Sequence, residues 1–267
     1  MKICEYVKTP FSRWVKKLNE RFGKLDLKEL IVLFGFMSAG KTEFAYFVAR
    51  QNIKLGNKVW FISLELDEDS MKLRIARKKA CVSKIEFQEK RYTEIQEQLM
   101  QKTLTELDEQ KWLFLICPEA KDTGSLMIQL RELYDKWCRL FIIDNLDKIA
   151  WSSDENERYK TITNALQDFK NENSVCILLL HHAKKPPKAG EYLPAGMSGL
   201  RWSQKILDNA TQVIEIRRDL DPDNKDNRDE VMIFQYKDTF EGANGVETIY
   251  FKKWDYYEEK QSENYIF

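Results

Sequence analysis

The chain has 267 residues, with 43 Lys and Arg against 43 Asp and Glu, so its formal net charge is zero. This balance excludes attraction of nucleic acid by overall charge, while a local basic channel stays compatible with it. The five cysteines are scattered without a C-x-x-C pair, which argues against a disulfide framework or zinc site and favours a reduced, cytoplasmic compartment. No apolar run is long enough to span a membrane, and the length suits one large domain with appendages.

Residues 1–25 predict a basic amphipathic arm. Apolar residues recur at helical spacing with basic residues between them: Phe11, Trp14, Val15, Leu18 and Phe22. Packing of this stripe on its own domain and docking on a neighbouring subunit both fit the pattern. We expect the main domain at residues 26–255 and an acidic tail at 256–267.

A glycine-rich segment at 35–42 follows an apolar run at 30–34 of strand type and precedes a helix-like run at 43–50. It fits G-x-x-x-x-G-K-[ST], the phosphate-binding P-loop. Backbone N–H groups and the helix N-terminus hold phosphate in such a loop, while Lys41 would reach the β- and γ-phosphates and Thr42 would bind Mg²⁺. The predicted nucleotide-contacting residues are Gly35, Ser38, Ala39, Gly40, Lys41, Thr42 and Glu43.

The rest of the chain predicts an α/β fold. Apolar strands are expected at 58–64, 112–117, 140–144 and 175–180, and the helices between them at 69–81, 123–137 and 157–171. Apolar strands that alternate with helices indicate a mainly parallel central sheet flanked by helices. A further helix is expected at 198–209, followed by strands at 212–216, 230–236 and 246–251. The shorter connections between these last segments predict a C-terminal antiparallel extension.

Polar residues stand where the predicted strands end. Asp144 occupies the position at which P-loop proteins place a carboxylate beside Mg²⁺. Glu65 fits a base that orients and deprotonates the attacking water, and equally a charge at the start of the next helix. His181 and His182 offer a contact to the γ-phosphate, or a satisfied histidine at a strand end.

A loop rich in lysine, proline and glycine follows the two histidines. Its lysines are Lys184, Lys185 and Lys188. A basic loop beside a nucleotide site fits a grip on the phosphate backbone of nucleic acid, and it also fits a solvated surface loop.

Together these segments resemble the RecA-like ATPase domain of the DnaB-type replicative helicases. The resemblance rests on residues 34–45, Ser63-Leu64-Glu65, Ile143-Asp144-Asn145-Leu146 and the stretch from Gly199-Leu200-Arg201 to Asp208-Asn209-Ala210. It implies a RecA-like P-loop NTPase fold and ATP and Mg²⁺ as cofactors. It also implies three catalytic residues, Glu65, Lys41 and His182, the last at the position of a polar γ-phosphate sensor. It also implies that Arg201 and Lys237 contribute to the nucleotide site.

One departure concerns a late K-x-R segment, which in the family reaches into the neighbouring subunit's ATP site as a finger. Here Lys237-Asp238-Thr239 keeps the lysine and places threonine at the arginine position. Either Arg217 or Arg218 substitutes, or hydrolysis is weak. Since only about 25 residues precede the core, we expect no separate primase-binding domain.

The resemblance implies an ATP-dependent helicase or translocase on single-stranded DNA, assembled as a hexamer or filament, with DNA held by the three lysines of the basic loop. The alternative is an ATP-binding switch or helicase loader with weak hydrolysis.

Overall fold

The computed structural model describes residues 16–109, 113–116, 122–149, 155–183, 204–218, 229–239, 245–252, 255–257 and 259. The helices are α1 (Lys16–Phe22), α2 (Lys41–Lys54), α3 (Glu68–Lys79), α4 (Lys84–Gln88), α5 (Glu94–Asp108), α6 (Thr123–Asp135), the 3₁₀ helix η2 (Leu146–Lys148), α7 (Glu155–Asn173) and α8 (Gln204–Asn209). The strands are β1 (Leu30–Gly35), β2 (Val59–Ser63), β3 (Leu113–Ile116), β4 (Leu140–Asp144), β5 (Cys176–His182), β6 (Gln212–Arg218), β7 (Glu230–Asp238), β8 (Gly245–Lys252) and β9 (Asp255–Tyr257).

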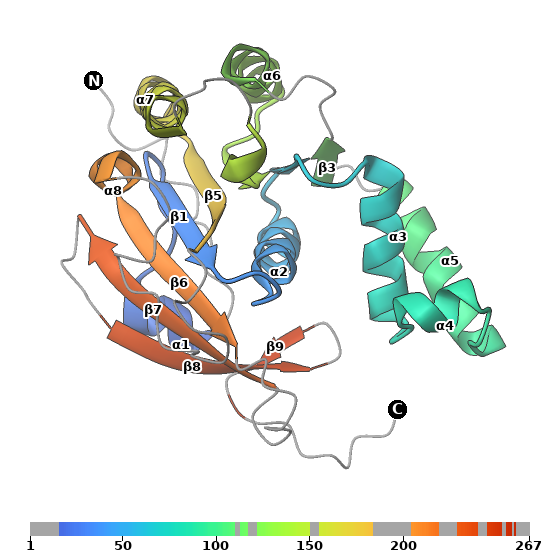
Figure 1. Ribbon diagram of the computed structural model, residues 1–267. Helices are drawn as coiled ribbons and strands as arrows, with labels where there is room; N and C mark the ends of the chain where they lie inside the picture. The colour runs from blue at the N-terminus through green and yellow to red at the C-terminus, as the bar shows by residue number, and fades with distance from the viewer. Residues whose placement is uncertain are drawn as a thin grey trace.

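In the described part of the chain, a nine-stranded sheet runs in the order β3-β2-β4-β5-β1-β6-β7-β8-β9 (Figure 1). The strands from β3 to β6 pair in parallel, and β7, β8 and β9 continue the sheet in antiparallel pairs. The predicted fold class is therefore confirmed. Because the carboxyl ends of parallel strands share one edge, β1, β2, β4 and β5 all end at the same side of the molecule.

The predicted antiparallel extension is confirmed by the pairing of β6, β7 and β8, whereas the direction of β6 relative to β1 was not predicted. Strand β6 pairs with β1 in parallel, and the direction changes only between β6 and β7. The physical reason lies in the connection, since the 29 residues at 183–211 leave room for a crossover that includes α8. Of the predicted helix at 198–209, residues 204–209 form α8 and the rest lies outside the described residues.

The core lies in two layers, one on each face of the sheet. Successive residues of β1 point to opposite faces, so Ile31 and Leu33 pack with α2 and α3, whereas Leu30 and Val32 pack with α6, α7 and α8. Both faces of β1 are fully buried. This explains why the strand has no polar alternation in the sequence.

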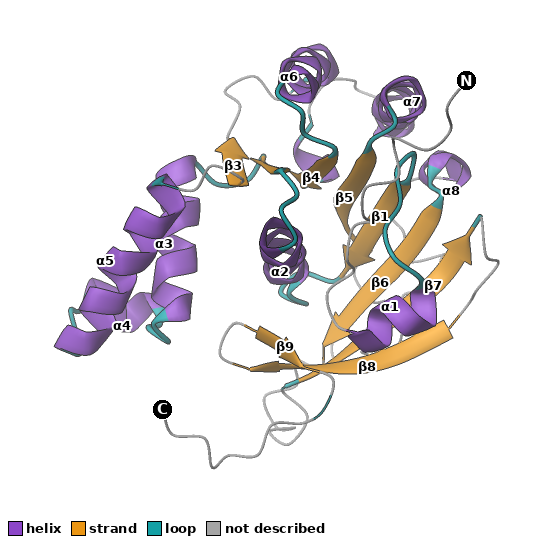
Figure 2. Ribbon diagram, turned by 180° about the vertical axis from the view of Figure 1, so that it is seen from behind, coloured by secondary structure: helices purple, strands orange, loops and turns teal. Residues whose placement is uncertain are grey.

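Helix α1 packs on the C-terminal strands of its own chain (Figure 2). Its apolar residues Leu18 and Phe22 are buried in the same cluster as Ile249 of β8, and Lys17 forms an ion pair with Glu247 at 2.6 Å. The described part of the predicted arm therefore follows the first of the two alternatives, while residues 1–15 lie outside the described residues. The boundaries of arm and tail stay predictions.

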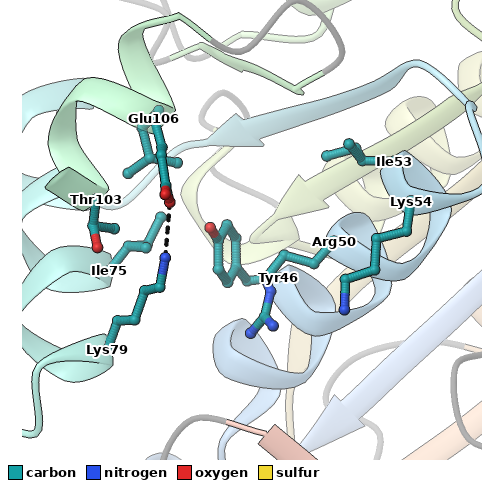
Figure 3. Close-up of a pocket in the computed structure, with 9 residues that line it drawn as sticks. Tyr46, Arg50, Ile53, Lys54, Ile75, Lys79, Thr103 and Glu106 are labelled. Carbon is teal, nitrogen blue, oxygen red and sulfur yellow. Dashed lines mark hydrogen bonds and ion pairs between the residues drawn. The ribbon is translucent and has the colours of Figure 1, made fainter. Parts of the chain in front are cut away.

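Helices α3, α4 and α5 project beyond the β3 edge of the sheet (Figures 1 and 2). They enclose a small core of their own around Ala76, Val82 and Met100. A pocket of about 170 Å³ separates this unit from the C-terminal half of α2, and the ion pair between Lys79 and Glu106 (2.8 Å) crosses one of its walls (Figure 3).

The close approach of β1 and β6 requires glycine at position 35. A Cβ atom on Gly35 would lie 2.4 Å from the backbone oxygen of Ile216. We expect Gly35→Ala to lower the free energy of unfolding by about 2 kcal/mol or more, because backbone atoms must separate to admit the methyl group. Chemical denaturation measures the change.

Gly124→Ala is the matched control, since among the described residues its Cβ would meet only the side chain of Asp122, at 3.2 Å, near the start of α6. We expect this variant to be neutral or more stable, because alanine favours helix over glycine. Equal losses in the two variants would show that the contact between β1 and β6 is not the constraint.

Candidate nucleotide-binding site

The P-loop connects the end of β1 to the start of α2. Gly40 precedes the helix with φ 95° and ψ 19°, in the left-handed region that favours glycine. The helical bonding starts with the N–H of Phe44, which donates to the carbonyl of Gly40 (2.9 Å). Since a glycine cap has no side chain, the first N–H groups of α2 remain directed toward an anion at this end.

Lys41 lies over the loop with its side chain directed back along it. Its Nζ donates to the carbonyl oxygens of Gly35 and Phe36, each at 2.9 Å, and the residue is 6% exposed. Burial lowers the pKa of Lys41 to about 8, and nearby carboxylates, chiefly Asp144, oppose the shift. The ammonium is therefore charged at neutral pH and held beside the loop.

The hydroxyl of Thr42 donates to Oδ2 of Asp144 at 2.7 Å. Thr42 lies in the first turn of α2 and Asp144 is the last residue of β4, so the bond joins the P-loop to a strand two places away in the sheet. Burial raises the pKa of Asp144 to about 6, against the hydrogen bond from Thr42. A hydroxyl and a carboxylate in contact at this edge offer hard oxygen ligands of the kind that Mg²⁺ prefers.

Glu65 lies in a polar cluster with Asn145 and His182, each just beyond or at the end of a neighbouring strand. Asn145 Nδ2 donates to Glu65 Oε1 (2.6 Å) and lies 3.0 Å from His182 Nε2, which is 3.5 Å from the same glutamate oxygen. The hydrogen bond with His182 lowers the pKa of Glu65, partial burial opposes it, and Asn145 adds to the lowering. The structure thus brings two of the three predicted catalytic residues, Glu65 and His182, into contact.

Sequence reasoning overlooked Asn145 and Asp147, which complete this edge. Asp147 accepts hydrogen bonds from the hydroxyl of Tyr159 and from the backbone N–H of His182. Its distance from Asp144 in the sequence, three residues within Ile-Asp-Asn-Leu-Asp, is the signal from which it could have been found.

The remaining predicted site residues differ in their positions. Glu43 lies beside the P-loop residues Ser38, Ala39 and Gly40 in the lining of one pocket, and its carboxylate pairs with Arg74 (2.5 Å) and Lys78 (3.2 Å) of α3. Lys237 donates to the carbonyl of Leu207 at the end of α8 (2.5 Å). Outside the described residues lie Arg201, Lys184, Lys185 and Lys188.

A basic pocket of about 230 Å³ borders the P-loop on the side of α3 and the C-terminal strands. The loop contributes Ser38, Ala39 and Gly40, and the opposite walls carry cationic and aromatic side chains: Arg74, Lys78, Arg218, Phe251 and Tyr256. The guanidinium of Arg218 lies over the Phe251 ring, 5.2 Å from its centre. Arg218 thus belongs to the surroundings of its own chain's P-loop.

A P-loop at the end of β1, a Thr–Asp contact across the sheet and a carboxylate cluster at the neighbouring strand ends define a RecA-like P-loop ATPase domain. A family model, the DnaB-like helicase C terminal domain, matches residues 11–257, so the chain belongs to this family. It is an ATPase domain of the DnaB-like helicase type.

Solved structures agree with this placement. The chain is similar to the ATPase domain of G40P, with a TM-score of 0.82 and 16% identity over 94% of this chain and 92% of that one. It is similar to a DnaB-like replicative helicase studied for its interactions with primase, with a TM-score of 0.81 and 16% identity. That match covers 94% of this chain and 63% of the helicase chain. The comparison with curated proteins gives no match.

Within the described ranges, none of the helices combines the length and the apolar composition needed to cross a bilayer.

The ion pairs of Glu43 connect α2 to α3 beside the loop. Its side chain is 10% exposed, whereas those of Arg74 and Lys78 are 30% and 40% exposed. Burial opposes ionisation of Glu43, but the charges of Arg74 and Lys78 outweigh it and hold the pKa below its usual value. The pairs therefore stabilise the folded chain wherever Glu43 is ionised.

We expect Glu43→Gln to lower the free energy of unfolding by about 2 kcal/mol at pH 7, because two cations lose a partly buried partner. Since the pKa is lower in the folded state, this stabilisation is present above the unfolded pKa of about 4.3 and disappears as pH falls further. Denaturation at pH 7 and pH 3 measures both values.

Glu106→Gln is the control, because its ion pair with Lys79 also involves α3 but both side chains are nearly half exposed. We expect a change below about 0.5 kcal/mol. A Glu43→Gln effect no larger than this, or one that persists unchanged at pH 3, would contradict the role of the ion pairs.

Proposed function

We propose that the chain is a Mg²⁺-dependent ATPase of the helicase or translocase type that acts on single-stranded DNA. The observation that carries the proposal is the convergence of Lys41, the Thr42–Asp144 contact and Glu65 at one edge of the sheet. ATP is the substrate that matches a P-loop with a carboxylate at hand for hydrolysis.

The loop and Lys41 bind the phosphates. The N–H groups at the start of α2 hold phosphate oxygens, and the Lys41 ammonium exchanges its loop carbonyls for the β- and γ-phosphates. Two buried atoms of the Glu65 cluster, Asn145 Oδ1 and His182 Nδ1, have no hydrogen-bond partner among the described residues. Buried polar atoms of this kind support a polar ligand at the same edge.

Thr42 and Asp144 fit a Mg²⁺ ion. Their oxygens already touch, and burial of Asp144 favours a state in which a cation or proton neutralises it. Mg²⁺ binds such sites through one or two protein oxygens together with phosphate oxygens. When bound, the ion neutralises charge that develops on the phosphates.

Glu65 orients the attacking water. Its lowered pKa keeps it ionised at neutral pH, and a weakly basic carboxylate acts more through hydrogen bonding and charge than as a strong base. Asn145 and His182 fix its position from the ends of β4 and β5. His182 is the residue of this cluster that would contact the γ-phosphate.

The basic pocket takes the nucleoside end of ATP. Lys41 and Glu65 define the γ-phosphate end of the loop, and the pocket borders Ser38, Ala39 and Gly40 on the side of α3. Its aromatic residues Phe251 and Tyr256 offer apolar surface, and Arg218 offers a flat cation, both suited to a base.

The partners follow from the family and from the sequence. Single-stranded DNA would be held by Lys184, Lys185 and Lys188, and Arg201 would contact nucleotide. Assembly would be a hexamer or a filament, with Lys237 directed to a neighbouring chain's site.

Two substitutions separate binding from hydrolysis. We expect Lys41→Ala to lose nucleotide binding and turnover, because it removes the charge that holds the phosphates. We expect Glu65→Gln to bind ATP normally and to lose turnover by about 100-fold or more, because its carboxylate acts on the water and not on the phosphates. Fluorescent-nucleotide titration and phosphate release measure the two properties.

Arg50→Ala on the far half of α2 is the control, and it should leave both unchanged. Normal turnover in Glu65→Gln would remove Glu65 from the mechanism, and normal ATP binding in Lys41→Ala would contradict the assignment of the P-loop.

A second function, an ATP-binding switch or helicase loader with weak hydrolysis, is favoured by one observation. Thr239 stands where the family places its finger arginine, and its hydroxyl donates to the backbone carbonyl of Thr211 (3.0 Å). An arginine finger contributes about 10³- to 10⁵-fold in rate, so a chain without one hydrolyses slowly unless another cation replaces it.

The ATPase rate with and without single-stranded DNA decides between the two functions. For the motor we expect stimulation of about tenfold or more, since DNA completes the intersubunit sites. Tight ATP binding with negligible turnover in both conditions would support the switch. Double-stranded DNA at equal nucleotide concentration is the control for charge alone.

A further inference from the structure

We infer that Asp147 is a positioning residue, which with Tyr159 and His181 fixes the main chain of His182 and thereby the Glu65 cluster. This inference rests on the proposed function, in which that cluster hydrolyses ATP. The Asp147 carboxylate lies in a network between η2, β5 and α7. Three groups approach its carboxylate: the Tyr159 hydroxyl (2.8 Å), the His182 backbone N–H (3.1 Å) and His181 Nδ1 (3.2 Å).

Beyond the last paired residues of β4 and β5, the Asp147 carboxylate provides the hydrogen-bond acceptor that the sheet no longer supplies. Strands β4 and β5 pair only as far as Ile143 and Leu179, so His182 extends past the last β4 partner. The N–H of His182 donates to Asp147 Oδ2 instead, and the N–H of the next residue, Ala183, donates to the carbonyl of Gly35 (2.9 Å). His182 is thus held between η2 on one side and the start of the P-loop on the other.

The fixed backbone of His182 determines the orientation of its imidazole ring. Asn145 Nδ2 carries two hydrogens, of which one goes to Glu65 (2.6 Å) and the other is within reach of His182 Nε2 (3.0 Å). Nε2 can accept that hydrogen only when its own proton is absent. A protonated Nε2 donates to Glu65 instead, at 3.5 Å, so the position of the ring relative to Asn145 and Glu65 determines which contact it makes.

Burial and hydrogen bonding hold the network of Asp147, Tyr159 and His181 in position. His181 is fully buried, and its ring packs edge-on against Tyr159 with 5.4 Å between the centroids. Burial disfavours the charge of Asp147, yet His181, Tyr159 and the His182 N–H outweigh it and hold the pKa of Asp147 well below its usual range. An ionised acceptor of several hydrogen bonds fixes its donors more firmly than a neutral one.

Tyr159 extends the network into α7 and beyond. Its carbonyl accepts a hydrogen bond from Thr163 (2.6 Å), and Thr163 in turn accepts one from Asn209 at the end of α8 (3.2 Å). A displacement of α8 relative to α7 would therefore reach His182 through Tyr159 and Asp147.

The kinetic test uses Asp147→Asn, which keeps the size of the side chain, and Tyr159→Phe, which removes one hydroxyl. We expect kcat to fall by about 10- to 100-fold in Asp147→Asn and less in Tyr159→Phe, because small displacements of catalytic groups are costly. KM for ATP should change by less than about twofold, since the phosphate-binding loop is untouched. Tyr134→Phe, which alters a tyrosine of α6 outside the network, should change neither.

A double substitution separates positioning from general loss of structure. If Asp147 acts through His182, Asp147→Asn should cost less than about twofold when His182 is already alanine. Full additivity of the two losses would overturn the inference.

A second measurement does not depend on turnover. The chain contains two histidines, so a ¹⁵N-histidine spectrum holds two imidazoles, and His182→Ala assigns them. We expect the chemical shifts of the His182 ring nitrogens to differ between the wild-type chain and Asp147→Asn, because a displaced imidazole loses its contacts with Asn145 and Glu65. Tyr134→Phe should match the wild type.

Unchanged His182 signals in folded Asp147→Asn would overturn the positioning role, as would an unchanged kcat. Absence of ATP turnover in the wild-type chain would instead contradict the proposed function, and the spectrum would still decide the role of Asp147.

Discussion

The hydrogen bond from Thr42 to Asp144 determines how the rest of the site is arranged. Strand β5 lies between β1 and β4, so the start of α2 must reach across it to meet Asp144. This fixes β4 at the distance where its next residue, Asn145, contacts Glu65 from β2 and His182 from β5. Four strand ends thus acquire a defined relation through one 2.7 Å contact.

The buried charges of Lys41 and Asp144, at the edge of the sheet where the strands end, stabilise each other. Burial works against the charge of Lys41 and of Asp144, shifting their pKa values toward neutrality to about 8 and about 6. Each charged group lowers the cost of the other, and removal of one leaves a buried charge without its partner. A phosphate bound at the loop would meet the Lys41 cation, whose charge nearby carboxylates already stabilise.

The sequence predicted those parts of the fold and site that depend on local pattern. The P-loop, Asp144, Glu65 and His182 each stand at a strand end, and parallel pairing alone brings such residues to one edge. The sequence did not predict contacts between residues that lie far apart along the chain and meet only through packing. Tyr159 meets Asp147 from α7, and Glu43 turns to Arg74 of α3, because helix faces and not strand ends determine those partners.

The sequence left the direction of β6 relative to β1 open for a related reason. A parallel return needs only a long enough connection, and length does not distinguish a crossover from a hairpin with a long loop. Strand β6 buries Val213 and Ile216 on opposite faces of the sheet. An antiparallel strand with the same pattern of apolar residues could bury them equally well, so the pattern does not reveal the direction.

The Lys237–Thr239 segment bears on how copies of the chain would assemble. The N–H of Thr239 donates to the carbonyl of Thr211, whose own N–H donates to the carbonyl of Leu30 at the start of β1. The P-loop follows the end of the same strand, roughly 17 Å away along six residues. Lys237 and the P-loop of one chain thus lie near opposite ends of β1. A nucleotide that contacts both groups would therefore lie between two chains placed head to tail. Such an interface is heterologous, and repeated rotation gives a ring where it closes and a filament where it does not. Because Lys237 caps the carbonyl end of α8 within its own chain, its use by a neighbour would release α8, the same helix that Asn209 connects through α7 to the catalytic cluster.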